Sequence, residues 1–443
     1  MSAIVEKYRQ AGIIAQNALS VVISQLHKGI GEQSVGEVCR MGDEYIMAQA
    51  ARCFKTVTEK GVARPVEICK NDFVSGIAPD AHDTFQAGIV SEGDVVKVTL
   101  GVHIDGFTVM AGHTVIIREE QPPAAPVVGP DANSAIAAYL ATEAVVSLLS
   151  SVISDTHSLH HVEVTGRVVR QVVEDIAAAF GSMVVPGSRV RRIKRFVAGQ
   201  PTVRDSLPNV EWREHSEDDE TKLVEELDAQ FQAKPGHTYL IDISMAPRLE
   251  QDGYIKLAEV PSIGSAIEGP SIYTRDHTVT YQLRTAAGRQ LLGAADKQLS
   301  VFPFKLGYLA NLSNLSINQI RLGVNECVQR HLLVGDPRLR AAFVPEYRTK
   351  EAAPVTTARE VATLSLVPGQ KSGSGYPEVL RLSGGRFFPP SWTHSERALG
   401  PGLAADALNA RLTPHQGLKY VEIKPTQRSL AEPPVDQDMA IEA

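Results

Sequence analysis

Residues 94–118 read Asp94-Val-Val-Lys-Val-Thr-Leu-Gly-Val-His-Ile-Asp-Gly-Phe-Thr-Val-Met-Ala-Gly-His-Thr-Val-Ile-Ile-Arg118. Two runs rich in β-branched residues, which are typical of strands, flank the dipeptide Asp105-Gly106. Asp-Gly is favoured in tight hairpin turns because both turn residues need positive φ angles. The stretch therefore predicts a long β-hairpin, and with it a protein that contains a sheet. Its histidines, His103 and His113, are expected to be core residues with hydrogen bonds, and the alternative is that one of them lines a cleft.

Helices and further strands are predicted on both sides of this hairpin. Apolar residues recur at helical spacing before it over about residues 5–26 and 35–54, and after it over 132–154 and 162–180. Further on, the pattern predicts strands over 238–245, 362–367 and 378–382, and helices over 281–299 and 320–332. The mixture predicts an α/β (α+β) fold.

Three segments are expected to lie outside the core of this fold. An acidic stretch within residues 204–236 indicates a solvated inserted loop. The helices within 281–349 indicate a separate helical insert, and the composition of 400–443 is typical of a disordered tail. Residues 1–280 and 350–399 would then form the core.

The composition is typical of a globular intracellular protein with a large core. The chain has 443 residues, 43% hydrophobic content and a net charge of -7, which permits a large core and does not indicate general nucleic-acid binding. We expect no secretory signal and no membrane contact. The four cysteines are scattered without metal-ligand spacing, which favours a reducing compartment.

The hairpin and the order of elements resemble the methionine aminopeptidase family, which has the pita-bread fold. This resemblance covers most of residues 1–395. In that family two aspartates, a histidine and two glutamates hold two divalent metals, because hard dications require several converging carboxylates and an open position for water. The resemblance implies the same fold here, with a helical insert and an acidic inserted loop.

The ligand positions of that family carry other residues in this chain. The alignment places them at Thr99, Met110, Arg191, Asp242 and either Val361 or Ser365. The nearby Glu360 is expected on the other face of its strand. One carboxylate cannot hold a dication, and an arginine would place a fixed positive charge in the metal position. We expect no metal and no other cofactor, no catalytic residue, and a buried salt bridge between Arg191 and Asp242. An alignment without a gap from Val197-Ala198-Gly199 would instead put Arg189 inward.

Three separated segments resemble one branch of the family more closely. They begin at Lys97 (Lys-Val-Thr-Leu-Gly-Val-His-Ile-Asp-Gly), at Val185 (Val-Pro-Gly-Ser-Arg-Val-Arg-Arg-Ile-Lys-Arg-Phe-Val-Ala-Gly-Gln) and at Glu378 (Glu-Val-Leu-Arg-Leu-Ser-Gly-Gly). They are similar to the fungal export factors of the large ribosomal subunit, whose cousins are the proliferation-associated proteins. The resemblance implies a non-enzymatic protein that shuttles between nucleus and cytoplasm and binds late pre-60S particles near the polypeptide exit tunnel. Its implied partners are ribosomal RNA and tunnel-rim ribosomal proteins, a small basic protein, and the Phe-Gly repeats of nuclear pores.

A basic strip lies inside the second of those segments. It puts five cations into residues 189–195, namely Arg189, Arg191, Arg192, Lys194 and Arg195. Such a strip suits phosphate contact, although a solvated face or a localisation signal has the same composition. We take Arg189, Arg192, Lys194 and Arg195 as the candidates for RNA binding. The alternatives are an active metal-dependent aminopeptidase and a general RNA- or DNA-binding regulator like the proliferation-associated proteins.

Overall fold

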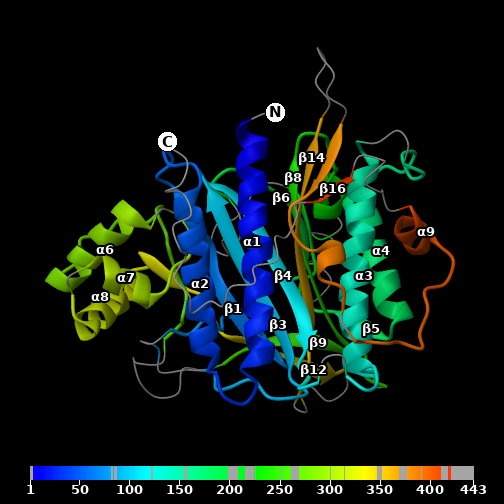
Figure 1. The fold of residues 1–443 in the computed structure, drawn as a ribbon, viewed down its shortest axis with the longest axis horizontal. Helices are drawn as coiled ribbons and strands as arrows, with labels where there is room; N and C mark the ends of the chain where they lie inside the picture. Colours follow the sequence, from blue (N-terminus) through cyan, green and yellow to red (C-terminus); the bar gives the residue numbers. More distant parts are fainter. Residues whose placement is uncertain are drawn as a thin grey trace, which may run out of the picture.

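A mixed sheet forms the centre of the protein (Figure 1). The structure is a computed structural model that describes residues 3–80, 83, 87–120, 123–153, 157–197, 208–214, 224, 226–250, 252–260, 269–299, 301–313, 315–346, 352–368, 377–390, 392–410 and 418–420. Within these residues the main path of the sheet is β1 (Lys60–Lys70), β3 (Val95–Ile104), β4 (Phe107–Ile116), β14 (Ala358–Val367), β8 (Thr238–Pro247), β6 (Arg189–Ile193) and β7 (Asn209–Glu211). Three strands join beside it: β5 (Ser182–Val184), β15 (Glu378–Arg381) and β16 (Leu418–Tyr420).

The predicted hairpin is confirmed as β3 and β4. The two strands pair without interruption from Val95↔Ile116 to Ile104↔Phe107. Asp105 and Gly106 have φ angles of 55° and 75°, as the tight turn requires. The hairpin lies in the middle of the sheet, where both of its faces are covered.

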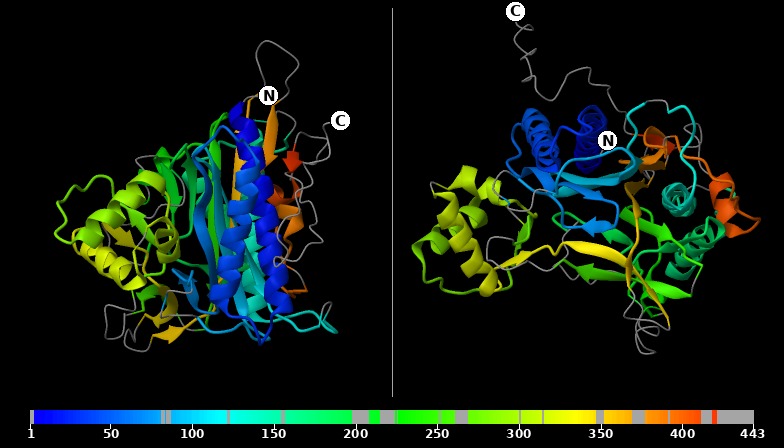
Figure 2. Two further views of the ribbon diagram at one scale, coloured as in Figure 1. Left: turned by 60° about the vertical axis from the view of Figure 1, so that its left-hand side comes forward. Right: turned by 90° about the horizontal axis from the view of Figure 1, so that it is seen from below.

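Two pairs of helices cover one face of the sheet (Figure 2). The first pair, α1 (Ala3–Lys28) and α2 (Val35–Arg52), packs on β1, β3 and β4. The second pair, α3 (Pro130–Ser151) and α4 (Gly166–Ala179), packs on β8 and β14 with α9 (Leu403–Asn409). Helix α3 is long and apolar enough to cross a membrane, but 83% of its most apolar window is buried in the protein, as in a core helix.

A smaller sheet lies on the other side of the central one. It contains β2 (Phe73–Ser75), β9 (Gly253–Glu259), β12 (Leu339–Pro345) and β13 (Ala353–Pro354). Its residues share an apolar cluster with Val185 and Ala246, which lie beside and within the central sheet. The space left between the two sheets is the site described below. A single 3-10 turn, η1 (Gly385–Phe387), follows β15.

The helical insert is present, with different limits from those expected. It consists of β10 (Tyr273–Arg275), α6 (Ala286–Gln298), α7 (Leu306–Leu312), α8 (Ile317–Gln329) and β11 (Leu333–Gly335), around an apolar cluster of its own. Figure 1 shows this body beside α2, at the left of the molecule. The expected span 281–349 extends too far, because β12 pairs with β9 and belongs to the smaller sheet.

Two other expected segments need correction. Inside the expected loop 204–236, β7 joins the central sheet and both Trp212 and Phe231 are buried in its core. The acidic residues at 215–223 and 225 lie outside the described residues. The tail 400–443 begins with an ordered helix, α9, whose Ala404 and Ala407 are buried, and β16 pairs with β15. Residues 411–417 and 421–443 lie outside the described residues.

Candidate functional site

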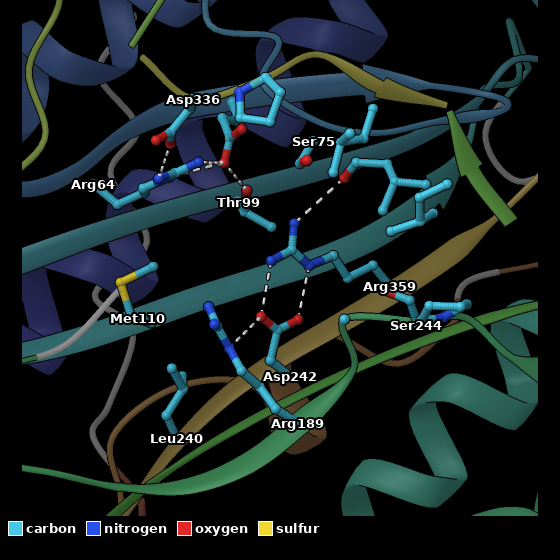
Figure 3. A pocket seen from close by; sticks show the side chains of 17 residues that line it. Arg64, Ser75, Thr99, Met110, Arg189, Leu240, Asp242, Ser244, Asp336 and Arg359 are labelled. Carbon is cyan, nitrogen blue, oxygen red and sulfur yellow. Dashed lines mark hydrogen bonds and ion pairs between the residues drawn. The ribbon is translucent and has the colours of Figure 1, made fainter. Parts of the chain in front are cut away.

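A cavity of about 200 Å³ lies on the face of the central sheet that the helices do not cover. Strands β1, β3, β4, β6, β8 and β14 supply its floor, and residues from β2, β9 and the start of β12 supply its opposite wall. Figure 3 shows charged side chains converging across it from these different strands. Three are arginines and three are acids, namely Arg64, Arg189, Arg359, Glu67, Asp242 and Asp336.

Arg64 and Glu67 form one half of this charged network. Irregular pairing of β1 between the two residues lets both face the cavity although they are three positions apart. Arg64 donates from Nε to Glu67 Oε2 at 3.0 Å and from a terminal nitrogen to Asp336 Oδ2 at 2.5 Å. Burial alone would raise the pKa of Glu67, but Arg64 and then Arg359 outweigh it and hold the pKa below its ordinary value.

Asp242 and Arg359 form the other half. Arg359 donates from Nε and from a terminal nitrogen to the two Asp242 oxygens, each at 2.8 Å, which is the bidentate geometry of a strong ion pair. Arg189 approaches the same carboxylate, with its Nε 3.9 Å from Oδ2. Burial raises the pKa of Asp242, but Arg359 and Arg189 more than compensate and lower it. Asp242 therefore stays ionised with both oxygens occupied by a guanidinium.

The sequence predicted a different partner for Asp242, and the structure corrects it. Across β6 and β8 the residue opposite Asp242 is Arg189, whereas Arg191 lies opposite Leu240. Arg189 and Arg191 share a face because side chains alternate along a strand. The prediction therefore named the correct face of β6 but a residue two positions too late. Asp242 pairs with Arg359 and Arg189, and the expected salt bridge with Arg191 is wrong.

The other expected ligand positions are divided between the cavity and its surroundings. Thr99 and Met110 line the cavity, and Thr99 Oγ1 donates to Glu67 Oε2 at 3.2 Å. Val361 packs instead in an apolar cluster with Met110, Ile193 and Leu240. Arg359, two residues earlier on the same face of β14, reaches the cavity in its place.

These residues do not fit a divalent metal. A dinuclear site needs several carboxylates whose oxygens are free to converge, and both Asp242 oxygens bind Arg359. Glu67 is bound to Arg64, Thr99 and the Gly76 backbone N–H. The three guanidinium charges balance the three carboxylates, so the cavity has no excess negative charge that would attract a dication. Within the described part of the chain, no group of three or more His, Cys, Asp and Glu side chains is arranged to hold a metal.

Sequence reasoning missed four of the residues in this network: Arg64, Glu67, Asp336 and Arg359. A signal for two of them existed, because Arg64 and Glu67 interrupt the otherwise apolar run Val62-Ala-Arg-Pro-Val-Glu-Ile-Cys69. A charge inside a strand that is buried on both faces needs a partner. Nothing local in the sequence connects either residue with Asp336, which follows the helical insert.

Two histidines of the hairpin were expected to be core residues with hydrogen bonds. His113 confirms this, since its Nδ1 lies 2.7 Å from Glu360 Oε1 on the helix-covered face. Glu360 thus points away from the cavity, as its place on the strand predicted. His103 is buried and stacks on Phe302 of the insert at 4.0 Å, but its Nδ1 has no hydrogen-bond partner among the described residues.

The basic strip is divided by the sheet. Arg189 faces the cavity, which removes it from the candidates for RNA contact, and Arg191 is buried. Lys194 and Arg195 are exposed, and Arg192 is half-buried. Arg195 is engaged at the hairpin turn, where its Nε donates to the Asp105 backbone oxygen at 2.8 Å and its guanidinium lies 4.9 Å from the Phe196 ring.

Known proteins share both the sequence and the fold of this chain. The "Probable metalloprotease ARX1" of Yarrowia lipolytica is 35% identical over 430 residues, covering 89% of this chain and 88% of that relative. Its namesake from Saccharomyces cerevisiae is 30% identical and covers 90% of this chain and 88% of its own length. The solved structure of a thermophilic Arx1 superposes with a TM-score of 0.70 at 15% identity, over 92% of this chain and 98% of that one, and the expected pita-bread fold of the methionine aminopeptidases is confirmed. No protein-family model matches the chain.

Proposed function

The chain belongs to the family of the probable metalloproteases ARX1, and we propose that it acts by binding and not by catalysis. The observation that carries this proposal is the pairing of Asp242 with Arg359. This pairing occupies both oxygens of Asp242, which is the one carboxylate among the expected metal-ligand positions. A guanidinium neutralises that carboxylate permanently, because arginine does not lose its proton in proteins.

The proposed partner is the late precursor of the large ribosomal subunit, which the protein would join near the polypeptide exit tunnel and accompany out of the nucleus. This proposal rests on the sequence resemblance described above. The exposed cation Lys194 supports it, because phosphate contacts position a protein on RNA without reading its sequence. A small basic protein, tunnel-rim proteins and the Phe-Gly repeats of nuclear pores complete the proposed set of partners. The protein would shuttle between nucleus and cytoplasm.

Affinity purification of the tagged full chain from its own cells tests the proposed partner. We expect large-subunit RNA and large-subunit proteins to co-purify, with little small-subunit RNA. An untagged strain is the control for particles that bind the resin. Recovery of free RNA without ribosomal proteins would instead support a general RNA-binding regulator and would contradict the proposal.

The family name favours one other candidate, a metal-dependent aminopeptidase. Release of methionine from short peptides by the purified chain, measured with added cobalt, manganese or zinc, separates the two functions. We expect no release above that of the buffer with the same metal. Turnover that depends on the added metal would overturn the non-catalytic proposal.

A further inference from the structure

A second hollow, of about 160 Å³, opens at the end of β6 and β8 on the opposite face of the sheet from the cavity. Arg192 of β6 lies opposite Tyr239 of β8. The side chain of Tyr239 belongs to the core under α3 and α4, together with Phe231. Lys234 and His237, which precede β8, complete the charged part of the wall. We call this hollow the Arg192 pocket.

Among the residues that the structure describes, the cations at the Arg192 pocket have no acidic partner. Its lining contains no Asp or Glu, and within the described ranges neither Arg192, Lys194 nor Lys234 forms an ion pair. The Nε atom of Arg192 is buried without a hydrogen-bond partner among those residues. The nearby carboxylate of Glu163 accepts a hydrogen bond from Gln232 at 2.9 Å. A buried donor without a partner is costly, and most such donors in native proteins are satisfied by a ligand or by water.

The electrostatic field in the pocket is positive. The pKa of His237 is lowered first by its burial and then by Arg192, Lys234 and Lys194, three cations that reach one imidazole. Its other neighbour is the Tyr239 hydroxyl, 3.3 Å from Nδ1, whose own pKa burial raises. A bound anion would reverse this effect, because a negative charge stabilises the protonated imidazole.

We propose that the Arg192 pocket binds a backbone phosphate of an RNA strand. A guanidinium presents parallel N–H groups that match the oxygens of a phosphate, and Lys234 and Lys194 add charge on either side. The pocket is large enough for more than one water-sized group, each of about 30 Å³. RNA is the source that fits best, because the positive charge continues past the pocket at the exposed Lys194. The choice of RNA rests on the function proposed above, whereas the anion site rests on the pocket alone.

The site is tested with the purified full chain and a short single-stranded RNA over a salt series. We expect Arg192→Gln/Lys234→Gln to weaken binding about tenfold or more. The slope of log affinity against log salt should fall by roughly 0.7 for each lost phosphate contact. The matched control is Arg284→Gln/Lys297→Gln, which removes the same charge from two exposed positions of the insert and should bind like the parent. Equal affinities for parent and pocket variant would refute the site.

A second measurement identifies the occupant. The pKa of His237, followed by NMR, should rise when the RNA is added, and less when inorganic phosphate is added alone. A rise with a phosphorylated peptide and none with RNA would overturn RNA as the occupant, and no rise with any of the three would overturn the site. Either failure leaves the ribosomal proposal standing if large-subunit particles still co-purify with the tagged chain. Conversely, the particles could fail to co-purify while the pKa of His237 still rises with RNA. The ribosomal proposal would then fail and the anion site would stand.

Discussion

Asp242 shows how a carboxylate can be accommodated in the interior of a sheet. It sits in the interior of the central sheet, 4% exposed, and a carboxylate at such a position needs a compensating cation. Arg359 and Arg189 supply that charge from the two neighbouring strands. Because arginine keeps its proton, this pair compensates the charge of the Asp242 carboxylate at any ordinary pH.

Replacement of Arg359 by methionine should destabilise the protein by about 3–5 kcal/mol, since it leaves a buried carboxylate unpaired. The Nε atom of Arg189 lies 3.9 Å from Asp242 Oδ2 and still compensates part of the carboxylate charge, which favours the lower end of this range. Denaturant unfolding measures the loss. The control is Arg40→Met, which breaks an exposed pair with Glu44 and should cost about 0.5 kcal/mol or less. Equal losses in the two variants would show that the Asp242 pair is not energetically buried.

The acid sensitivity of folding should depend on Asp242 as well. Its pKa is lowered in the folded state, so its contribution is complete above the ordinary aspartate pKa of about 4 and is lost as the pH falls through the folded value. Unfolding free energies measured between about pH 6 and pH 2 should therefore fall less steeply for Asp242→Asn than for the parent. Burial raises the pKa of Asp336 and so opposes this trend equally in both proteins. A slope that the substitution leaves unchanged would contradict the assignment.

The sequence predicted the faces of these residues better than their partners. Thr99, Met110 and Asp242 were all expected at the cavity and all line it. Arg191 and Val361 were each expected two residues too late, and each shares a face with the residue that reaches the cavity. A period of two fixes which side of a strand a residue faces, but a slip of two residues leaves that pattern intact. Only the pairing of β6 with β8 decides between Arg189 and Arg191.

At the scale of the elements, the β3–β4 turn connects three parts of the chain. Asp105 binds Lys7 of α1 and Arg195 beyond β6, and the Gly106 backbone oxygen accepts from the Phe196 N–H at 2.7 Å. A Cβ atom added at Gly106 would lie 2.6 Å from the Phe196 ring. The glycine is thus required twice, for its positive φ and for this close approach.

Gly106→Ala should consequently cost more than backbone strain alone. We expect a loss of about 2–4 kcal/mol, which combines the strain of a positive φ with the overlap at Phe196. Gly93→Ala isolates the first effect, because Gly93 has a φ of 87° and no atom within 4 Å of an added Cβ. That control should lose about 1–2 kcal/mol. Thermal or denaturant unfolding of the two variants decides, and identical losses would exclude the overlap.

Long elements were predictable and short ones were not. The hairpin and helices α1 to α4 were found from periodicity, because each spans enough residues to repeat its pattern. Helix α7 has seven residues, β7 and β16 have three each, and none of them repeats a pattern long enough to recognise. Their places are set by pairing with distant strands or by packing in the insert. The same limit hid the strand β7 inside the expected loop and the helix α9 at the start of the expected tail.

At the scale of the whole molecule, the cavity is a joint product of both sheets. Its charged residues come from β1, β6, β8 and β14 and from the segment that returns from the insert to β12. Their arrangement is therefore a single network in which every carboxylate already has an arginine partner. Restoring one ligand of a metal site adds a charge to that network without removing any of its arginines.

Thr99→Asp tests this property of the whole network. The new carboxylate would replace a hydroxyl that lies 3.2 Å from Glu67 Oε2, so two buried acids would face each other while Arg64 and Arg359 remain bound to their present partners. We expect no stoichiometric metal, no methionine release, and a stability about 1–3 kcal/mol below that of Thr99→Asn, which has the same shape without the charge. Elemental analysis of the purified variant and denaturant unfolding measure these outcomes. If Thr99→Asp bound about one cobalt, manganese or zinc ion per chain, the arginines would have to move aside, and the cavity would be a metal site lacking a single ligand.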